Sequence, residues 1–259
     1  RWPELVAVLQ LRVEAEQDAD LLAVHYNTMG EILEEQLRST DKAVEAYRQV
    51  LKQREDDETA LGALERIFTR EGRWRELIDI LSRRATATLE ADRVIAFKTR
   101  IGEIWENQLQ VADRAIEAYR EILRLDPFNV DSCRALERLY TAQDKWRDLV
   151  EVYGIWLAAT DDPRQQADLL TKTAAIHEEE FHDAPAAIEA FEQILQVQPD
   201  SETAIRSLER LYRDQKRWPE LIEVYRRHLD VAGGDREVSV FLLLATGAIF
   251  ADMLGDRDQ

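Results

Sequence analysis

The chain of 259 residues is acidic, with 52 Asp and Glu against 34 Lys and Arg and a formal net charge of −18. This charge repels polyanions such as DNA, RNA and anionic membrane surfaces, so we expect no nucleic-acid partner and favour a protein or peptide with a basic or apolar surface. Hydrophobic residues make up 45% of the chain, enough for a continuous core. The single cysteine, Cys133, cannot form an internal disulfide; we expect it in the core of a cytoplasmic protein.

The prolines and the spacing of apolar residues together predict an all-α protein. Apolar residues return every three or four positions, and no stretch alternates between apolar and polar residues as a strand would. Prolines stand only in first helical turns or just past helix ends. About fourteen helices are predicted, at 3–16, 20–37, 39–53, 57–70, 73–87, 90–109, 111–125, 129–142, 145–159, 163–181, 183–197, 201–214, 217–231 and 236–253. Their short connections predict antiparallel hairpins that stack to bury their apolar faces.

A strict internal repeat organises these helices. Trp2, Trp74, Trp146 and Trp218 follow one another with a constant 72-residue period, and they open the similar runs WPELVAVL, WRELIDIL, WRDLVEVY and WPELIEVY. Each period divides into two hairpins, a 34-residue step and a 38-residue step. We therefore expect one continuous α-solenoid over residues 1–259, with units that begin near residues 2, 74, 146 and 218.

Small residues recur at fixed places in the 38-step hairpins. The first helices carry Gly30, Gly102, Ala174 and Gly247, and the second helices carry Ala43, Ala115 and Ala187. A 34-residue helical hairpin with these small sites resembles the tetratricopeptide repeat family, in the form of a bacterial-type tandem array with a 72-residue double unit. The resemblance implies a right-handed superhelix that binds partners on a concave face lined by the first helix of each hairpin.

The 34-step hairpins depart from that pattern. Glu65, Glu137 and Glu209 stand where the family has a small residue in the first helix, and Leu77, Leu149 and Leu221 replace the small residue of the second. The packing inside these hairpins is therefore expected to be looser or differently rotated.

Both ends of the array lack a pairing helix in the sequence. The segment 2–16 corresponds to a second helix without a first one, and the segment 238–254 to a first helix whose partner would begin near Asp256. We infer a piece of a longer array whose ends could associate with one another. The segment 238–254 is also the most apolar run, but it is interrupted by Thr246, Gly247 and Asp252 and is shorter than the roughly 18 apolar residues that cross a bilayer. No membrane span is predicted.

No arrangement of residues predicts catalysis, a cofactor or a metal site, so we do not expect an enzyme. His177 and His182 resemble a zinc-binding HExxH motif, but they stand five residues apart. On a helix this spacing turns the two rings about 140° apart, so they cannot bind one zinc ion. His177 is expected to pack in the repeat and His182 to lie at a helix end.

The positions that the resemblance places on the concave face alternate between acidic and basic hairpins. They are Asn27, Glu31, Glu34, Arg66, Arg70, Glu103, Glu106, Arg134, Arg138, Arg206, Arg210, Arg213, Phe241 and Leu244. One interpretation pairs them with one another, Glu31 with Arg66 and Glu103 with Arg138, as weak surface ion pairs. The other is a groove for a peptide with charges of both signs. We therefore predict a non-catalytic protein-interaction scaffold or, alternatively, a structural spacer or self-associating repeat segment.

Overall fold

The computed structural model describes residues 1–232 and 235–253, which contain fourteen α-helices and three π-helical turns and no strand. The all-α prediction is confirmed. When each π turn is counted with the helix before it, every helix begins and ends within two residues of its predicted bounds. The segment expected to begin near Asp256 lies outside the described residues. The helices are α1 (Trp2–Ala15), α2 (Ala19–Glu31), α3 (Thr40–Gln53), α4 (Glu58–Glu71), α5 (Trp74–Ala87), α6 (Ala91–Glu103), α7 (Ala112–Leu125), α8 (Val130–Thr141), α9 (Trp146–Ala158), α10 (Pro163–Glu179), α11 (Ala184–Val197), α12 (Glu202–Asp214), α13 (Trp218–Val231) and α14 (Arg236–Ala248).

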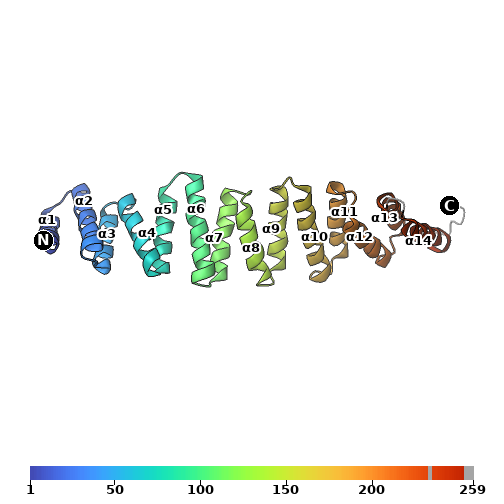
Figure 1. The fold of residues 1–259 in the computed structure, drawn as a ribbon, viewed down its shortest axis with the longest axis horizontal. Helices are drawn as coiled ribbons and strands as arrows, with labels where there is room; N and C mark the ends of the chain where they lie inside the picture. Colours follow the sequence, from blue (N-terminus) through green and yellow to red (C-terminus); the bar gives the residue numbers. More distant parts are fainter. Residues whose placement is uncertain (233–234, 254–259) are drawn as a thin grey trace. The chain divides into compact units, whose positions relative to one another are not determined.

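These helices fall into two compact units, Arg1–Asp126 with α1 to α7 and Pro127–Gln259 with α8 to α14. Within each unit every helix packs against the next one along the chain (Figure 1). Because the connections are short, neighbouring helices run antiparallel and form hairpins. Each unit is thus a stack of helical hairpins of the α-solenoid type.

Equivalent apolar positions are buried alike in the two units. Leu77, Leu149 and Leu221, at the start of the second helices, are at most 2% exposed. Cys133 and Trp156 are also buried, as expected for core residues. The repeated apolar stripe of each hairpin is therefore covered by its neighbours, which is what a stack of amphipathic hairpins requires. Ala43, Ala115 and Ala187 are fully buried as well.

In the first two 38-step hairpins, a glycine in the first helix leaves space for a tyrosine ring of the second helix. A Cβ atom on Gly30 would lie 2.6 Å from the ring of Tyr47, and one on Gly102 would lie 2.8 Å from the ring of Tyr119. Both distances are shorter than van der Waals contact, so only glycine fits at these positions. At both positions the group that comes closest to the glycine is the ring of a tyrosine on the second helix of the hairpin.

The turn inside each 34-step hairpin contains one residue with a left-handed backbone conformation. These residues recur every 72 residues, as the tryptophans do. Gly72, Asp144 and Lys216, each one period from the next, have φ values of 66°, 53° and 57°. In each turn the amide of the next residue donates to a carbonyl five residues back, as from Arg73 to Phe68 at 2.9 Å. This hydrogen bond satisfies a carbonyl that the helix end leaves free. The turns between the helices of the other hairpins use Arg38, Gln110 and His182, which also have positive φ.

Three of the four first helices of the 38-step hairpins, all but α10, end in wider turns. Ile32–Gln36 follows α2 and Ile104–Gln108 follows α6 as π-helical turns, and Ile249–Met253 follows α14. The amide of Leu37 donates to the carbonyl of Ile32 at 3.1 Å, and the equivalent bond from Leu109 to Ile104 measures 3.0 Å. A π turn inserts one residue into the helical period, so it rotates the side chains that follow. Glu34 lies in the first of these turns and occupies a central place in the site.

Candidate partner-binding surface

The first unit holds a cluster of charge on the face formed by its first helices. Glu34, in the π turn after α2, accepts a hydrogen bond at 2.7 Å from the Arg66 guanidinium of α4 and lies 3.5 Å from that of Arg70. A second nitrogen of Arg66, Nε, donates to the other carboxylate oxygen at 3.3 Å. The Glu34 side chain is only 6% exposed, whereas Arg66 and Arg70 are 57% and 54% exposed. A buried carboxylate therefore holds two exposed guanidinium groups in place.

This arrangement corrects the predicted pairing of Glu31 with Arg66. Arg66 binds Glu34, one helical turn further along the chain, and Glu31 is exposed to solvent. Glu34 lies in the π turn after α2, but a π turn is not required for this pairing, because the equivalent Glu178 pairs with Arg210 at the end of α10, where no π turn occurs. Glu103 belongs to the first unit and Arg138 to the second, so their pairing stays a prediction.

The second unit repeats the cluster two periods further along the chain. Glu178, near the end of α10, accepts two hydrogen bonds from Arg210 of α12, at 2.6 and 2.9 Å. The pair corresponds to Glu34 and Arg66, although a single nitrogen of Arg210 contacts both carboxylate oxygens. The carboxylate is 20% exposed and the arginine 53%, so again the acid is the more buried partner. Since both units build the pair from equivalent positions, it is a property of the repeat.

Three further predicted arginines are held within their own hairpin. Arg206 pairs with Glu202 of the same helix at 2.7 Å, and Arg134 with Asp131 at 3.5 Å. Arg213 donates to the hydroxyl of Tyr225 at 2.7 Å. Arg138 also interacts with another group. The face is thus lined by arginines whose charge is partly balanced, which agrees with the interpretation of mutual pairing.

The other predicted residues divide between structural and exposed positions. Asn27 donates to Asp57 at 3.1 Å, and Asp57 in turn caps the start of α4, so Asn27 joins two helices. Glu106 accepts a hydrogen bond from Tyr119 at 3.2 Å. Glu103 is exposed. Phe241 and Leu244 of α14 are 61% and 70% exposed and form an apolar patch.

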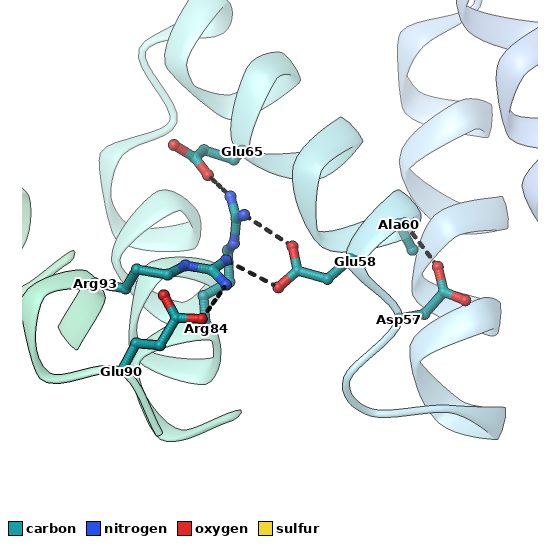
Figure 2. A network of polar contacts seen from close by, with 7 residues as sticks. All are labelled: Asp57, Glu58, Ala60, Glu65, Arg84, Glu90 and Arg93. Carbon is teal, nitrogen blue, oxygen red and sulfur yellow. Dashed lines mark hydrogen bonds and ion pairs between the residues drawn. The ribbon is translucent and has the colours of Figure 1, made fainter. Parts of the chain in front are cut away.

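A polar network inside the first unit could not be predicted from the pattern of the family (Figure 2). Arg84 of α5 binds Glu65 and, at 2.8 Å, Glu58, both on α4. Arg93 of α6 reaches Glu58 at 3.5 Å and Glu90 at 4.0 Å, so the network joins three consecutive helices. One feature of the sequence indicated this network: Glu65 stands where the family has a small residue.

Each of those glutamates has a partner on a neighbouring helix. Glu137 accepts from the hydroxyl of Tyr153 at 2.8 Å and from Lys172 at 3.0 Å, and Glu209 lies 2.6 Å from Nδ1 of His228. A polar side chain therefore fills the space between the two helices of each 34-step hairpin. The backbones of the two helices approach one another at fewer places in these hairpins than in the 38-step hairpins, which agrees with the expected looser or differently rotated packing.

Burial and charge shift the ionisation of tyrosines in the repeat. Burial raises the pKa of Tyr47, and the nearby Glu34 carboxylate adds to this rise. Burial also raises the pKa of Tyr153 and Tyr212, with hydrogen bonds to Glu137 and Glu192 as further causes. The folded protein therefore favours the neutral phenol at these three positions.

The two histidines of the HEEEFH segment have different surroundings. The ring of His177 meets that of Phe181 edge to face, with 5.4 Å between their centres. His182 has a positive φ in the turn after α10 and its Nδ1 lies 3.2 Å from the carbonyl oxygen of Glu178.

Across residues 1–232 and 235–253 no group of three His, Cys, Asp or Glu side chains is arranged to hold a metal ion. In the same residues no helix has the length and apolar character needed to span a bilayer.

Fold and surface together define an all-α repeat protein built from stacked helical hairpins. Residues 60–93, 132–167 and 204–239 match the sequence profile of the tetratricopeptide repeat, and each match begins one 72-residue period after the one before. Each of these three segments is therefore a tetratricopeptide repeat. All three matches fall on the 34-step hairpins, whose glutamates depart from the small-residue pattern, so this departure does not remove them from the family.

The fold is also similar to solved tetratricopeptide repeat structures at low sequence identity. The crystal structure of MamA is 15% identical, with a TM-score of 0.39 over 69% of this chain and 93% of that chain. YrrB, described as a protein with an unusual peptide-binding site, is 14% identical, with a TM-score of 0.37 over 71% of this chain and 91% of its own. The complex of the TPR2AB domain of yeast Sti1 with pHSP90 is 16% identical, with a TM-score of 0.32 over 88% and 99%. No curated protein sequence matches the chain.

Proposed function

We propose that this chain is a non-catalytic scaffold that binds a protein or peptide partner on the face formed by the first helices of its hairpins. The observation that carries the proposal is the pairing of Arg66 with Glu34 and of Arg210 with Glu178. Each guanidinium is held by a carboxylate beneath it, while more than half of the arginine side chain remains exposed. An arginine held in this way loses less conformational freedom on binding than a free one.

The chemistry of this face fits a peptide with charges of both signs. A guanidinium group offers parallel N–H donors to a carboxylate of the partner, and the exposed Glu31 and Glu103 offer acceptors to its basic residues. The competing interpretation is that these charges only join neighbouring hairpins. Exposed pairs of this kind contribute about 0 to 1 kcal/mol each, so loss of an arginine would then change stability slightly and binding not at all.

The test removes two cations without leaving a buried acid unpaired. Arg70→Gln leaves Arg66 on Glu34, and Arg206→Gln breaks only an exposed pair within α12. Binding is measured by fluorescence anisotropy against an array of synthetic peptides of about 15 residues, with mixed charge, the length of a helix of this chain. The double variant removes one cation from the first-helix face of each unit. We expect it to bind the selected peptides at least about fivefold more weakly, since one lost charged contact is worth about 1 kcal/mol or more.

The matched control is Arg226→Gln, which removes an exposed arginine from α13, a second helix. It should bind the same peptides as well as the wild type. Equal affinities of the double variant and the wild type for every selected peptide would reject the first-helix face as the binding surface.

A second candidate function, self-association of the repeat segment, is favoured by two exposed apolar faces. Leu5 of α1 is 39% exposed, whereas its repeat equivalent Leu77 is fully buried. On α14, Phe241 and Leu244 are exposed as well. Sedimentation velocity over a range of concentrations tests this function: the wild type should form dimers or larger species, and the variant Leu5→Ser with Phe241→Ser should remain monomeric. A monomeric wild type at high concentration would exclude self-association.

A further inference from the structure

The second helices of the first unit form a groove that lies apart from the face proposed above. It runs between α3 and α5, has a volume of about 590 Å³, and includes Leu51, Phe68 and Ile80 in its lining. These three side chains are at most 6% exposed, so it is their outer edges that form the apolar floor of the groove. A groove with such a floor accepts apolar side chains of a partner.

Basic residues line the rim of this groove. Arg48 and Lys52 come from α3, and Arg75 and Arg83 come from α5. Arg48 and Lys52 are one helical turn apart, about 6 Å along the axis, and therefore lie on the same side of α3. A local positive charge of this kind stands out in a chain whose net charge is −18.

The acidic residues of the rim are already engaged. Glu76 accepts two hydrogen bonds from Arg73, which lower the pKa of this carboxyl group. Asp79 pairs with Arg83 at 3.4 Å.

Three cations remain for a partner. In the described part of the chain, no carboxylate lies within ion-pair distance of Arg48, Lys52 or Arg75; Arg48 instead lies over the Phe68 ring, at 5.9 Å from its centre. Three positive charges beside an apolar floor are complementary to a segment that is both acidic and apolar.

The equivalent groove in the second unit has the same floor and the opposite charge. It lies between α11 and α13, has a volume of about 320 Å³, and includes Leu195, Tyr212 and Val224, which correspond to Leu51, Phe68 and Ile80. Glu192 and Gln196 stand at the positions of Arg48 and Lys52. The hairpins of the second unit thus form this groove without basic residues at these positions, and there the hydroxyl of Tyr212 donates to Glu192, a contact that Phe68 cannot make.

We infer that the groove between α3 and α5 binds an acidic amphipathic helix of a partner protein. Leucine or phenylalanine side chains of that helix contact the floor, and two carboxylates four residues apart contact Arg48 and Lys52. A nucleic acid does not suit the groove, because the floor is apolar and the whole chain repels a polyanion. Arg75 binds a third carboxylate from the opposite side of the groove.

The test uses a fluorescent synthetic peptide of about 16 residues, which as a helix matches the length of α3 and α5. The peptide carries leucine and phenylalanine on one helical face and glutamate on both flanks. Two control peptides replace the glutamates with lysine or the apolar residues with serine. We expect anisotropy to report binding of the first peptide to the wild type, weakened by salt, and at least about tenfold weaker binding of both controls.

Variants of the protein exchange the residues of the two equivalent grooves. Arg48→Glu with Lys52→Gln takes the residues of the second unit and should reduce the affinity about tenfold or more, because it reverses one charge and removes another. Glu192→Arg with Gln196→Lys should raise the number of bound peptides per chain from one to two. The control Arg226→Glu changes the net charge as much as Arg48→Glu does, outside the lining of both grooves, and should leave the affinity unchanged.

Several results would overturn the inference. They are a wild type that does not bind the acidic peptide, equal binding of the acidic and lysine peptides, and an unchanged affinity of Arg48→Glu with Lys52→Gln. The Arg70→Gln, Arg206→Gln variant separates this site from the first-helix face: it should bind the acidic peptide as the wild type does. A loss of affinity in that variant would place the peptide on the first-helix face instead.

Discussion

Replacement of Gly30 by alanine tests whether the ring of Tyr47 sets the distance between α2 and α3. The added Cβ atom would lie 2.6, 2.7 and 2.9 Å from three carbons of the ring. Tyr47 is only 1% exposed, so its neighbours prevent the ring from moving away. Overpacking of this kind costs about 1 to 3 kcal/mol. Alanine also gains about 1 kcal/mol over glycine within a helix, which partly offsets this cost.

Gly62→Ala provides the matched control. Gly62 lies within α4 of the same unit, and a Cβ atom there would meet no atom within 4 Å. This variant should therefore be more stable than the wild type by about 1 kcal/mol. The gain from helix propensity is common to both substitutions, so Gly30→Ala should be less stable than Gly62→Ala by about 1 to 3 kcal/mol, the cost of the ring contact alone.

The assay is urea unfolding followed by circular dichroism at the helical band, with the midpoint and slope fitted for each variant. Unfolding of a repeat array need not be a single transition, so the comparison uses the transition that both substitutions shift. Two variants that stabilise the protein equally would refute the reasoning, because they would show that the ring gives way at no cost. In the third hairpin of this type, where Ala174 meets Phe191 in place of a tyrosine, the chain itself accommodates the Cβ atom.

Three further predictions use the same unfolding assay. Lys216→Gly should stabilise the protein by about 0.5 to 1 kcal/mol and Gly72→Ala should destabilise it by about 1 kcal/mol, because both positions have positive φ; opposite signs would contradict this reading of the turns. Glu34→Gln should cost about 1 to 2 kcal/mol, since it weakens the charged hydrogen bonds from Arg66 to a buried group; an unchanged urea midpoint would count against it. The raised pKa of Tyr47 favours the neutral phenol in the fold, so its contribution is complete below the unfolded value of about 10 and declines above it. Stability should therefore fall less between about pH 10 and 11 in Tyr47→Phe than in the wild type, and equal slopes would exclude this cause.

The helices could be predicted from the sequence because each carries its own amphipathic stripe, and the tryptophans that begin the second helices set the register of the whole repeat. The partner of Arg66 could not be predicted in this way. Glu34 and not Glu31 meets Arg66, and the equivalent pair of Glu178 with Arg210 forms where α10 has no π turn. The choice between the two glutamates therefore follows from side-chain packing at the end of the first helix, which no change of composition marks.

The polar contacts between the two helices of a 34-step hairpin also could not be predicted from the sequence repeat. Glu65, Glu137 and Glu209 could be recognised as exceptions in the sequence, but their partners differ from hairpin to hairpin. An arginine, a tyrosine with a lysine, and a histidine each satisfy the same carboxylate position. Since several side chains meet one requirement, their identity follows from the local packing and not from the repeat.

The turns at Gly72, Asp144 and Lys216 bear on how such a chain changes length during evolution. All three close with a hydrogen bond of the same kind, from Arg73, Lys145 and Arg217 to a carbonyl five residues back, although three different residue types occupy the left-handed position. Recombination between the gene segments for any two of these turns would add or remove one or two whole periods and would recreate the same junction. A further 72-residue unit can therefore arise by duplication alone, because the existing turn sequence already joins one unit to the next.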